Sequence, residues 1–228
     1  MKRNTEAKKS INNSHWLQSR SSHEIKGYQI ETCFGSGGCP NRANTAIPLA
    51  GKIEQVLNKE DLFSFLKERI NGELRPHQEF RIAIAECPNA CSQPQIKDIG
   101  IIGACIPKVT YKECTSCNAC IEACMENAIA IDDNLSKPVF DYSLCINCGQ
   151  CMGVCPTGTI ETGKMGFRIL LGGKLGRHPR LAKELPDIYE IDQVIDIVRK
   201  CIKLYKKHST HGERFADIFR SELLSGED

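Results

Sequence analysis

Cys114-Thr-Ser-Cys117-Asn-Ala-Cys120-Ile-Glu-Ala-Cys124 and Cys145-Ile-Asn-Cys148-Gly-Gln-Cys151-Met-Gly-Val-Cys155 are two copies of one cysteine pattern. Each copy reads C-x2-C-x2-C-x3-C, a spacing with which thiolates ligate 4Fe–4S clusters. In this arrangement three thiolates of a run bind one cluster, and the fourth thiolate binds the cluster of the other run. The stretch therefore predicts two clusters that exchange ligands, with Cys114, Cys117, Cys120 and Cys155 at the first and Cys145, Cys148, Cys151 and Cys124 at the second.

Zinc is the alternative for such a stretch, because paired C-x-x-C hairpins also form structural zinc sites. A zinc ion needs four ligands, usually as two pairs, and leaves no role for the third cysteine of each run. The tandem runs therefore favour a two-cluster 4Fe–4S ferredoxin module of the bacterial kind, which we place at residues 109–163. Met125 departs from the pattern, since proline usually follows the fourth cysteine.

The length and cysteine content of the chain limit the kind of protein and the cellular compartment in which this module can occur. The chain has 228 residues, enough for one compact domain with a small insert, and 14 cysteines. Because eight of them are already assigned as thiolate ligands, we expect a reducing, cytoplasmic compartment rather than a disulfide scaffold. The sequence has no apolar run of the roughly 18 residues that a membrane span needs, and its first residues show no signal-peptide core.

Charge is unevenly distributed along the chain. Residues 109–163 carry a net charge of −5, so the remainder carries +7 of the overall +2. A basic remainder could bind nucleic acid, but no aromatic–basic motif accompanies it, and a solvated surface is the simpler interpretation. We therefore expect no nucleic-acid partner, and an acidic module beside a basic body suits the docking of a redox donor protein.

Outside the module, hydrophobic periodicity predicts an α/β (α+β) body of one sheet and several helices. Residues 1–25 read as a polar N-terminal arm with a short helix near Trp16. The body then comprises residues 26–108 and 164–228, interrupted by the ferredoxin module. Strands are expected over 27–31, 79–86, 98–103 and 167–171, and helices over 51–70 (one broken or two short), 188–207 and 213–224.

A second metal constellation has different spacings. Cys33-x5-Cys39 and Cys87-x3-Cys91 each lie on a loop beside a predicted strand. If the two loops converge, four thiolates could hold one more cluster. Spacing alone leaves buried, redox-active or zinc-binding cysteines, taken together, as good an interpretation as a cluster.

The residues around these cysteines resemble the sulfite and nitrite reductase family. Its signature is C-x5-C followed later by C-x3-C, and the segment from Arg81 to Gly103 is similar to the family's second motif throughout. The segment from Gly166 to Arg180 and the Glu213-Arg-Phe tail resemble the family's C-terminal segment. The resemblance covers residues 27–225 and implies a reductase-type sheet-and-helix domain interrupted by the ferredoxin module, as in the dissimilatory and anaerobic branches.

The resemblance also implies a third 4Fe–4S cluster coupled to siroheme, and the six-electron reduction of a small anion, sulfite or nitrite. Cys91 would bridge the cluster to siroheme, and Asn89 would lie at the macrocycle face. Arg42 and Lys97 are the candidates for the anion, and Lys174 and Arg177 for the siroheme. Arg180 could contact carboxylates or the anion, and a solvated surface base is the simpler interpretation of each of these residues. The full ligand set that the family implies for this cluster is Cys33, Cys39, Cys87 and Cys91.

The family carries an N-terminal domain ahead of its first cysteine pair, whereas only 32 residues precede Cys33 here. Two alternatives follow from this difference. The chain could be a multi-cluster electron-transfer protein without siroheme, or a partner reductase subunit could supply the missing half of the pocket. Cys105 and Cys201 stay unassigned, and Cys201 reads as a small apolar residue of a helix.

Overall fold

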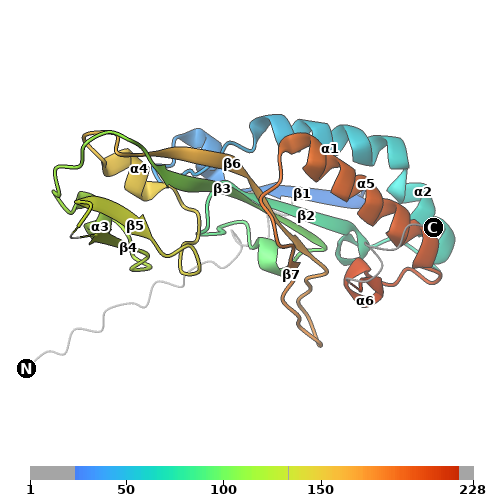
Figure 1. The fold of residues 1–228 in the computed structure, drawn as a ribbon. Helices are drawn as coiled ribbons and strands as arrows, with labels where there is room; N and C mark the ends of the chain where they lie inside the picture. Colours follow the sequence, from blue (N-terminus) through green and yellow to red (C-terminus); the bar gives the residue numbers. More distant parts are fainter. Residues whose placement is uncertain (1–23, 133, 221–228) are drawn as a thin grey trace, which may run out of the picture.

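A mixed five-stranded sheet organises the chain in the computed structural model, which describes residues 24–132 and 134–220. Its strand order is β1-β2-β3-β6-β7; β1, β2 and β3 run parallel, and β6 and β7 continue the sheet in antiparallel fashion (Figure 1). The expected α+β fold class is confirmed. The strands are β1 (Tyr28–Thr32), β2 (Phe80–Ala85), β3 (Ile99–Val109), β6 (Ile160–Leu171) and β7 (Lys183–Glu184).

Helices cover one face of this sheet. The broken periodicity over 51–70 becomes two helices, α1 (Ile47–Glu60) and α2 (Leu62–Arg69), as expected. Asp61 separates them in a left-handed conformation, and its side chain accepts the N–H of Ser64 to cap α2. The helix α5 (Ile191–His208) lies beside α1 (Figure 1), and the inward residues of both helices join one core with the sheet.

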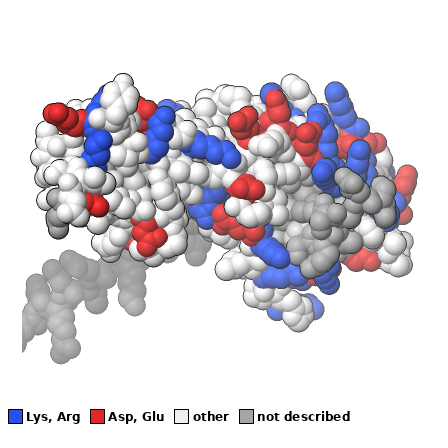
Figure 2. Space-filling view, in the orientation of Figure 1, with Lys and Arg blue, Asp and Glu red and all other residues white. Residues whose placement is uncertain are grey.

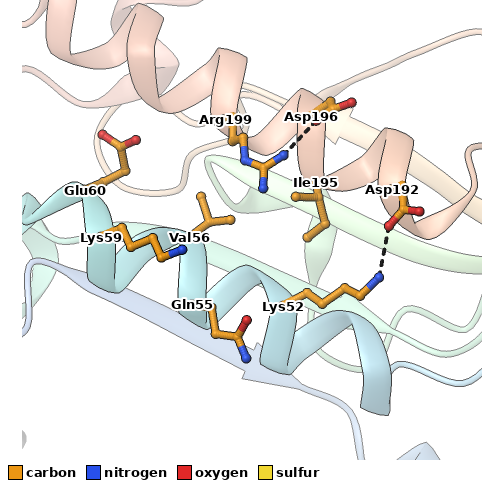
Figure 3. A pocket seen from close by; sticks show the side chains of 9 residues that line it. All are labelled: Lys52, Gln55, Val56, Lys59, Glu60, Asp192, Ile195, Asp196 and Arg199. Carbon is orange, nitrogen blue, oxygen red and sulfur yellow. Dashed lines mark hydrogen bonds and ion pairs between the residues drawn. The ribbon is translucent and has the colours of Figure 1, made fainter.

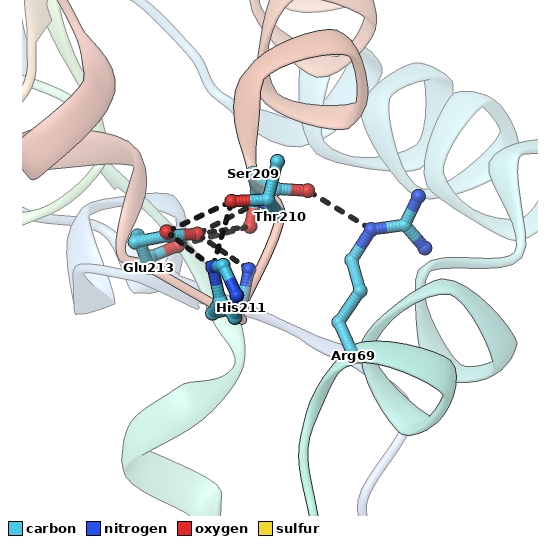
Figure 4. A network of polar contacts seen from close by, with 5 residues as sticks. All are labelled: Arg69, Ser209, Thr210, His211 and Glu213. Atoms are coloured by element: carbon cyan, nitrogen blue, oxygen red, sulfur yellow. Dashed lines mark hydrogen bonds and ion pairs between the residues drawn. The ribbon is translucent and has the colours of Figure 1, made fainter.

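The final helix is shorter than predicted. A helix was expected over 213–224, but α6 spans only Phe215–Ile218, and residues 221–228 lie outside the described chain, as does the segment around Trp16. Glu213 explains the late start, because its carboxylate accepts the backbone N–H groups of Thr210 and His211 and closes the turn after α5 (Figure 4). Arg69 ties α2 to the same turn by donating to the Ser209 carbonyl at 2.9 Å.

Two strands are longer than predicted, and together they form a ribbon that carries the cysteine-rich segment. β3 and β6 extend well beyond the expected strands at 98–103 and 167–171, pairing from Ile99–Leu171 to Val109–Ile160 with a bulge at Ile106/Pro107. The segment beyond the ribbon holds a two-stranded sheet and two short helices at one end of the molecule (Figure 1). These are α3 (Ala119–Glu122), β4 (Ile129–Asp132), β5 (Lys137–Phe140) and α4 (Gln150–Val154).

The density of charged side chains differs between the cysteine-rich segment and the sheet-and-helix body. On the face drawn in Figure 2, they are sparse over the segment with α3, α4, β4 and β5, and crowded over α1 and α5. Lysine and arginine side chains also gather on the loop between β6 and β7. None of the helices within residues 24–132 and 134–220 is long and apolar enough to cross a membrane.

Candidate metal centres

Twelve of the fourteen cysteines fall into three sets of four, each lining one cavity. None of the fourteen forms a disulfide bond. Among the described residues, no three His, Cys, Asp or Glu side chains converge in the manner of a site for a single metal ion. The first set is Cys114, Cys117, Cys120 and Cys155; the second is Cys124, Cys145, Cys148 and Cys151; the third is Cys33, Cys39, Cys87 and Cys91.

The first set encloses a cavity of about 20 Å³ between α3 and the end of α4. Backbone N–H groups point at its sulfurs: Ser116 N lies 3.4 Å from Cys114 Sγ, and Ile160 N lies 3.5 Å from Cys155 Sγ. Burial acts to raise the pKa of Cys155, but hydrogen bonds from Ile160 and Thr157 outweigh it, so this pKa lies below its ordinary value. Such donors stabilise a thiolate, the form that ligates metal.

The second set surrounds a larger cavity, of about 300 Å³. Cys151, on α4, is buried, and desolvation together with the neighbouring thiols of Cys148, Cys145 and Cys124 raises its pKa to about 12. The N–H of Ala128 lies 3.3 Å from the sulfur of Cys124. A buried thiol with so high a pKa is stable as a thiolate only beside a compensating positive charge, which a bound metal ion would supply.

The third set lies where two neighbouring strands end. β1 and β2 are parallel with Thr32 opposite Ile84, so the loops that follow them leave the same edge of the sheet. Cys33 and Cys39 belong to the loop after β1, and Cys87 and Cys91 follow β2. The four cysteines line a cavity of about 70 Å³, in which Cys87 is buried and Cys91 is exposed.

Glu86 holds the two loops of the third set together. Its backbone N–H lies 3.3 Å from Cys33 Sγ, and its carbonyl accepts the N–H of Ala43 at 2.9 Å. Its buried carboxylate accepts the N–H of Ala46 at 2.6 Å, at the start of α1, and packs against Gly35. Sequence reasoning overlooked Glu86; the one signal was a charged residue at the end of an apolar strand, directly before Cys87.

The weaker site candidates divide into two groups. Arg42 and Asn89 are exposed and line the third cavity. Lys97 does not line it; its ammonium is 2.6 Å from the Glu31 carboxylate and largely buried. Lys174, on the loop after β6, forms an ion pair with Asp217 of α6.

The remaining basic candidates lie on that same loop. Arg177 is exposed, whereas Arg180 donates to the carbonyls of Gly172 and Ala216. The structure therefore brings Arg42 and Asn89 to the third cavity, and not Lys97, Lys174, Arg177 or Arg180.

The two unassigned cysteines differ in their surroundings. Cys201 is fully buried in α5 among core side chains, as expected for a small apolar residue, and burial raises its pKa to about 12. Cys105, on β3, is buried between the second and third sets. The strand predicted over 98–103 ended before Cys105, and no sequence pattern indicated this neighbourhood.

Several relatives of the chain are named as sulfite reductases or their subunits. It is 30% identical over 203 residues to the coenzyme F420-dependent sulfite reductase of Methanocaldococcus jannaschii, covering 84% of this chain and 32% of that protein. It is 30% identical over 169 residues to the beta subunit of the dissimilatory-type sulfite reductase of Archaeoglobus fulgidus, covering 70% and 44%. The chain thus spans less than half the length of either relative.

A solved structure supports the fold. The crystal structure of dissimilatory sulfite reductase I (DsrI) superposes with a TM-score of 0.56 at 16% identity, covering 86% of this chain and 51% of that one. Residues 27–221 match the family described as the nitrite and sulphite reductase 4Fe-4S domain. This match spans the sheet, the covering helices and all three cysteine sets, and the chain belongs to that family.

Proposed function

We propose that this chain binds two ferredoxin-type 4Fe–4S clusters at its first and second cysteine sets, and a third 4Fe–4S cluster coupled to siroheme at its third set, in order to reduce sulfite or nitrite. The observation that carries the proposal is the third cavity, where thiols from the C-x5-C and C-x3-C motifs meet at one sheet edge. The family and the named relatives agree with this chemistry. When bound, the coupled siroheme and cluster supply the multi-electron chemistry of a six-electron reduction.

The cysteines of the third cavity differ in exposure, and we assign them different roles accordingly. The buried Cys87 and the half-buried Cys33 and Cys39 would hold the cluster from the protein side, with backbone N–H groups bonded to the Cys33 sulfur. The exposed Cys91 is the cysteine of this set that would contact siroheme. The exposed guanidinium of Arg42 at the rim suits an oxyanion.

A second candidate function is multi-cluster electron transfer without siroheme. It is favoured by the ion pairs of Lys97 with Glu31 and of Lys174 with Asp217, which leave few described bases for binding carboxylates and the anion. A partner subunit could provide these bases, since the chain spans 32% of the length of the F420-dependent relative. The dissimilatory-type relative is itself named as a subunit.

The iron content and visible spectrum of protein purified without oxygen test the proposal. We expect about thirteen irons with siroheme bands, because three cubanes hold four irons each and siroheme one. About twelve irons without haem bands would establish the electron-transfer alternative, and about eight would show that the third set is empty. Reduction of sulfite or nitrite with an artificial donor then separates a reductase from a carrier.

Two cysteine variants test whether Cys91 is the residue that binds siroheme. Cys91→Ser should remove the siroheme bands, whereas Cys201→Ser, in the core of α5, should leave them unchanged. A spectrum that is the same in wild type and Cys91→Ser would refute the assignment of Cys91. Activity that requires a co-purifying polypeptide would identify the missing half of the pocket.

A further inference from the structure

One strand touches both the second and the third cysteine sets. At Gly103 of β3, an added Cβ would lie 2.6 Å from the carbonyl oxygen of Glu86, directly before Cys87. Two residues further on, the Cys105 N–H donates to the Asn147 carbonyl at 2.8 Å, and Cys105 forms a parallel β-bridge with Cys148. Two residues of a strand span about 7 Å, so β3 fixes the two ligand loops at neighbouring positions.

Side chains fill the space between these loops. Cys105 is buried, and its sulfur lies 3.9 Å from the sulfur of Met152, the residue after Cys151. Both side chains belong to one small apolar cluster with Cys87 and Ala43. Gly149 allows the close approach, because a Cβ there would lie 3.4 Å from Cβ of Cys105 and 2.9 Å from Cε of Met152.

The residues that line the cavities also place the second set closer to the third than the first set is. The cavity of the second set is also lined by Cys87, Pro88 and Asn89, which belong to the third-set loop. Among the described residues that line the first cavity, none comes from that loop. The second set is therefore next to the third, and the first set is further away along the segment.

We propose that Cys105 and Met152 are positioning residues, which hold the second set against the third so that the clusters bound at these two sets are neighbours. This inference rests on the proposed function, since it requires a cluster at each set. One electron at a time would then pass across the junction of Cys105 and Met152, without making or breaking a bond, from a low-potential one-electron reductant outside the protein. Neither side chain is a metal ligand in this proposal.

Magnetic coupling between reduced clusters tests the inference without relying on turnover. Full-length protein is reduced with excess dithionite, and its electron paramagnetic resonance spectrum is recorded. We expect splitting from a pair of nearby clusters, lost in Cys148→Ser, which removes a ligand of the second set, and kept in Cys117→Ser, which removes a ligand of the first. Splitting that is absent in wild type, kept in both variants, lost in both, or lost only in Cys117→Ser would overturn the adjacency.

The positioning role is tested by Cys105→Leu, which should push the loops apart and weaken the splitting while the iron content stays at the wild-type value. Cys201→Leu is the matched control, because Cys201 is equally buried but packs in the α5 core. If Cys105→Leu does not assemble, Met152→Ala loosens the same junction without overpacking it. Unchanged splitting in the variant that assembles would refute the role.

The iron count separates this inference from the proposed function. About eight irons in wild type would mean that the third set holds no cluster, and the proposed function would fail. About twelve or more irons without splitting would leave the proposed function standing and refute the adjacency alone.

Discussion

At the scale of single residues, the third site depends on a close contact between Gly35 and Glu86. Gly35 lies in the turn between Cys33 and Cys39, and the Glu86 carboxylate occupies the position that a side chain at residue 35 would need. The same carboxylate bonds the N–H of Ala46 at the start of α1. A larger residue at position 35 therefore displaces a group that joins both cysteine loops.

We predict that Gly35→Ala empties the third set. The new methyl group overlaps Oε2 of Glu86, so the carboxylate must move and the Cys33 loop with it. Gly37→Ala is the control within the same turn, because no atom lies within 4 Å of its added Cβ. Iron analysis should show a loss of about four irons in Gly35→Ala and none in Gly37→Ala. Equal iron content in the two variants would contradict the prediction.

At the scale of elements, the groove between α1 and α5 shows which contacts hold the helices together (Figure 3). Lys52 pairs with Asp192 across the groove at 2.9 Å, but the Lys52 side chain is 49% exposed to solvent and that of Asp192 is 90% exposed. Exposed pairs contribute little because water screens them. Ile195 at the base of the groove is only 5% exposed and belongs to the main core. Apolar packing therefore dominates this contact.

Substitutions separate the two contributions. Ile195→Ala should lower the free energy of unfolding by about 2–4 kcal/mol through lost burial and a cavity. Lys52→Ala should lower it by less than about 1 kcal/mol. Urea denaturation of the two variants under anaerobic conditions gives both values. A larger loss in Lys52→Ala than in Ile195→Ala would show that the ion pair controls the contact.

Periodicity predicted the types of these elements better than their ends. Apolar spacing identified α1, α2, α5 and the buried parts of the sheet, because core burial imposes that spacing. The outer halves of β3 and β6 escaped prediction; in β6, residues 161–165 are exposed on the ribbon and carry no apolar alternation. The short α6 also escaped it, because the turn at Glu213 is closed by side-chain bonds that compete with the helix.

At the scale of the whole molecule, cysteine spacing predicted more of the site than any other feature. The spacing proposed which thiols belong together, and each of the three groups of four lines one cavity, with Cys87 of the third group lining the second cavity as well. The sequence could not reveal which sets are neighbours. That depends on the β3–β6 ribbon, which carries the cysteine-rich segment back toward Cys87 through Cys105. Such a long-range contact leaves no local pattern in the sequence.

Asp98 makes the stability of the whole fold depend on pH. It is fully buried beside β2, where it accepts the Arg81 N–H at 2.9 Å, and desolvation raises its pKa from 3.8 to about 6 despite the nearby Arg214. A raised pKa in the folded state means that protonation favours folding, so this stabilisation is full below about pH 4 and is lost as pH rises through about 6. Between pH 5 and 7 we expect wild type to lose about 1 kcal/mol of unfolding free energy relative to Asp98→Asn, which cannot titrate at this position. Anaerobic urea titrations of both proteins across this range measure the difference. Parallel pH profiles, or a wild type that gains stability over the same range, would show that Asp98 stays ionised in the folded protein.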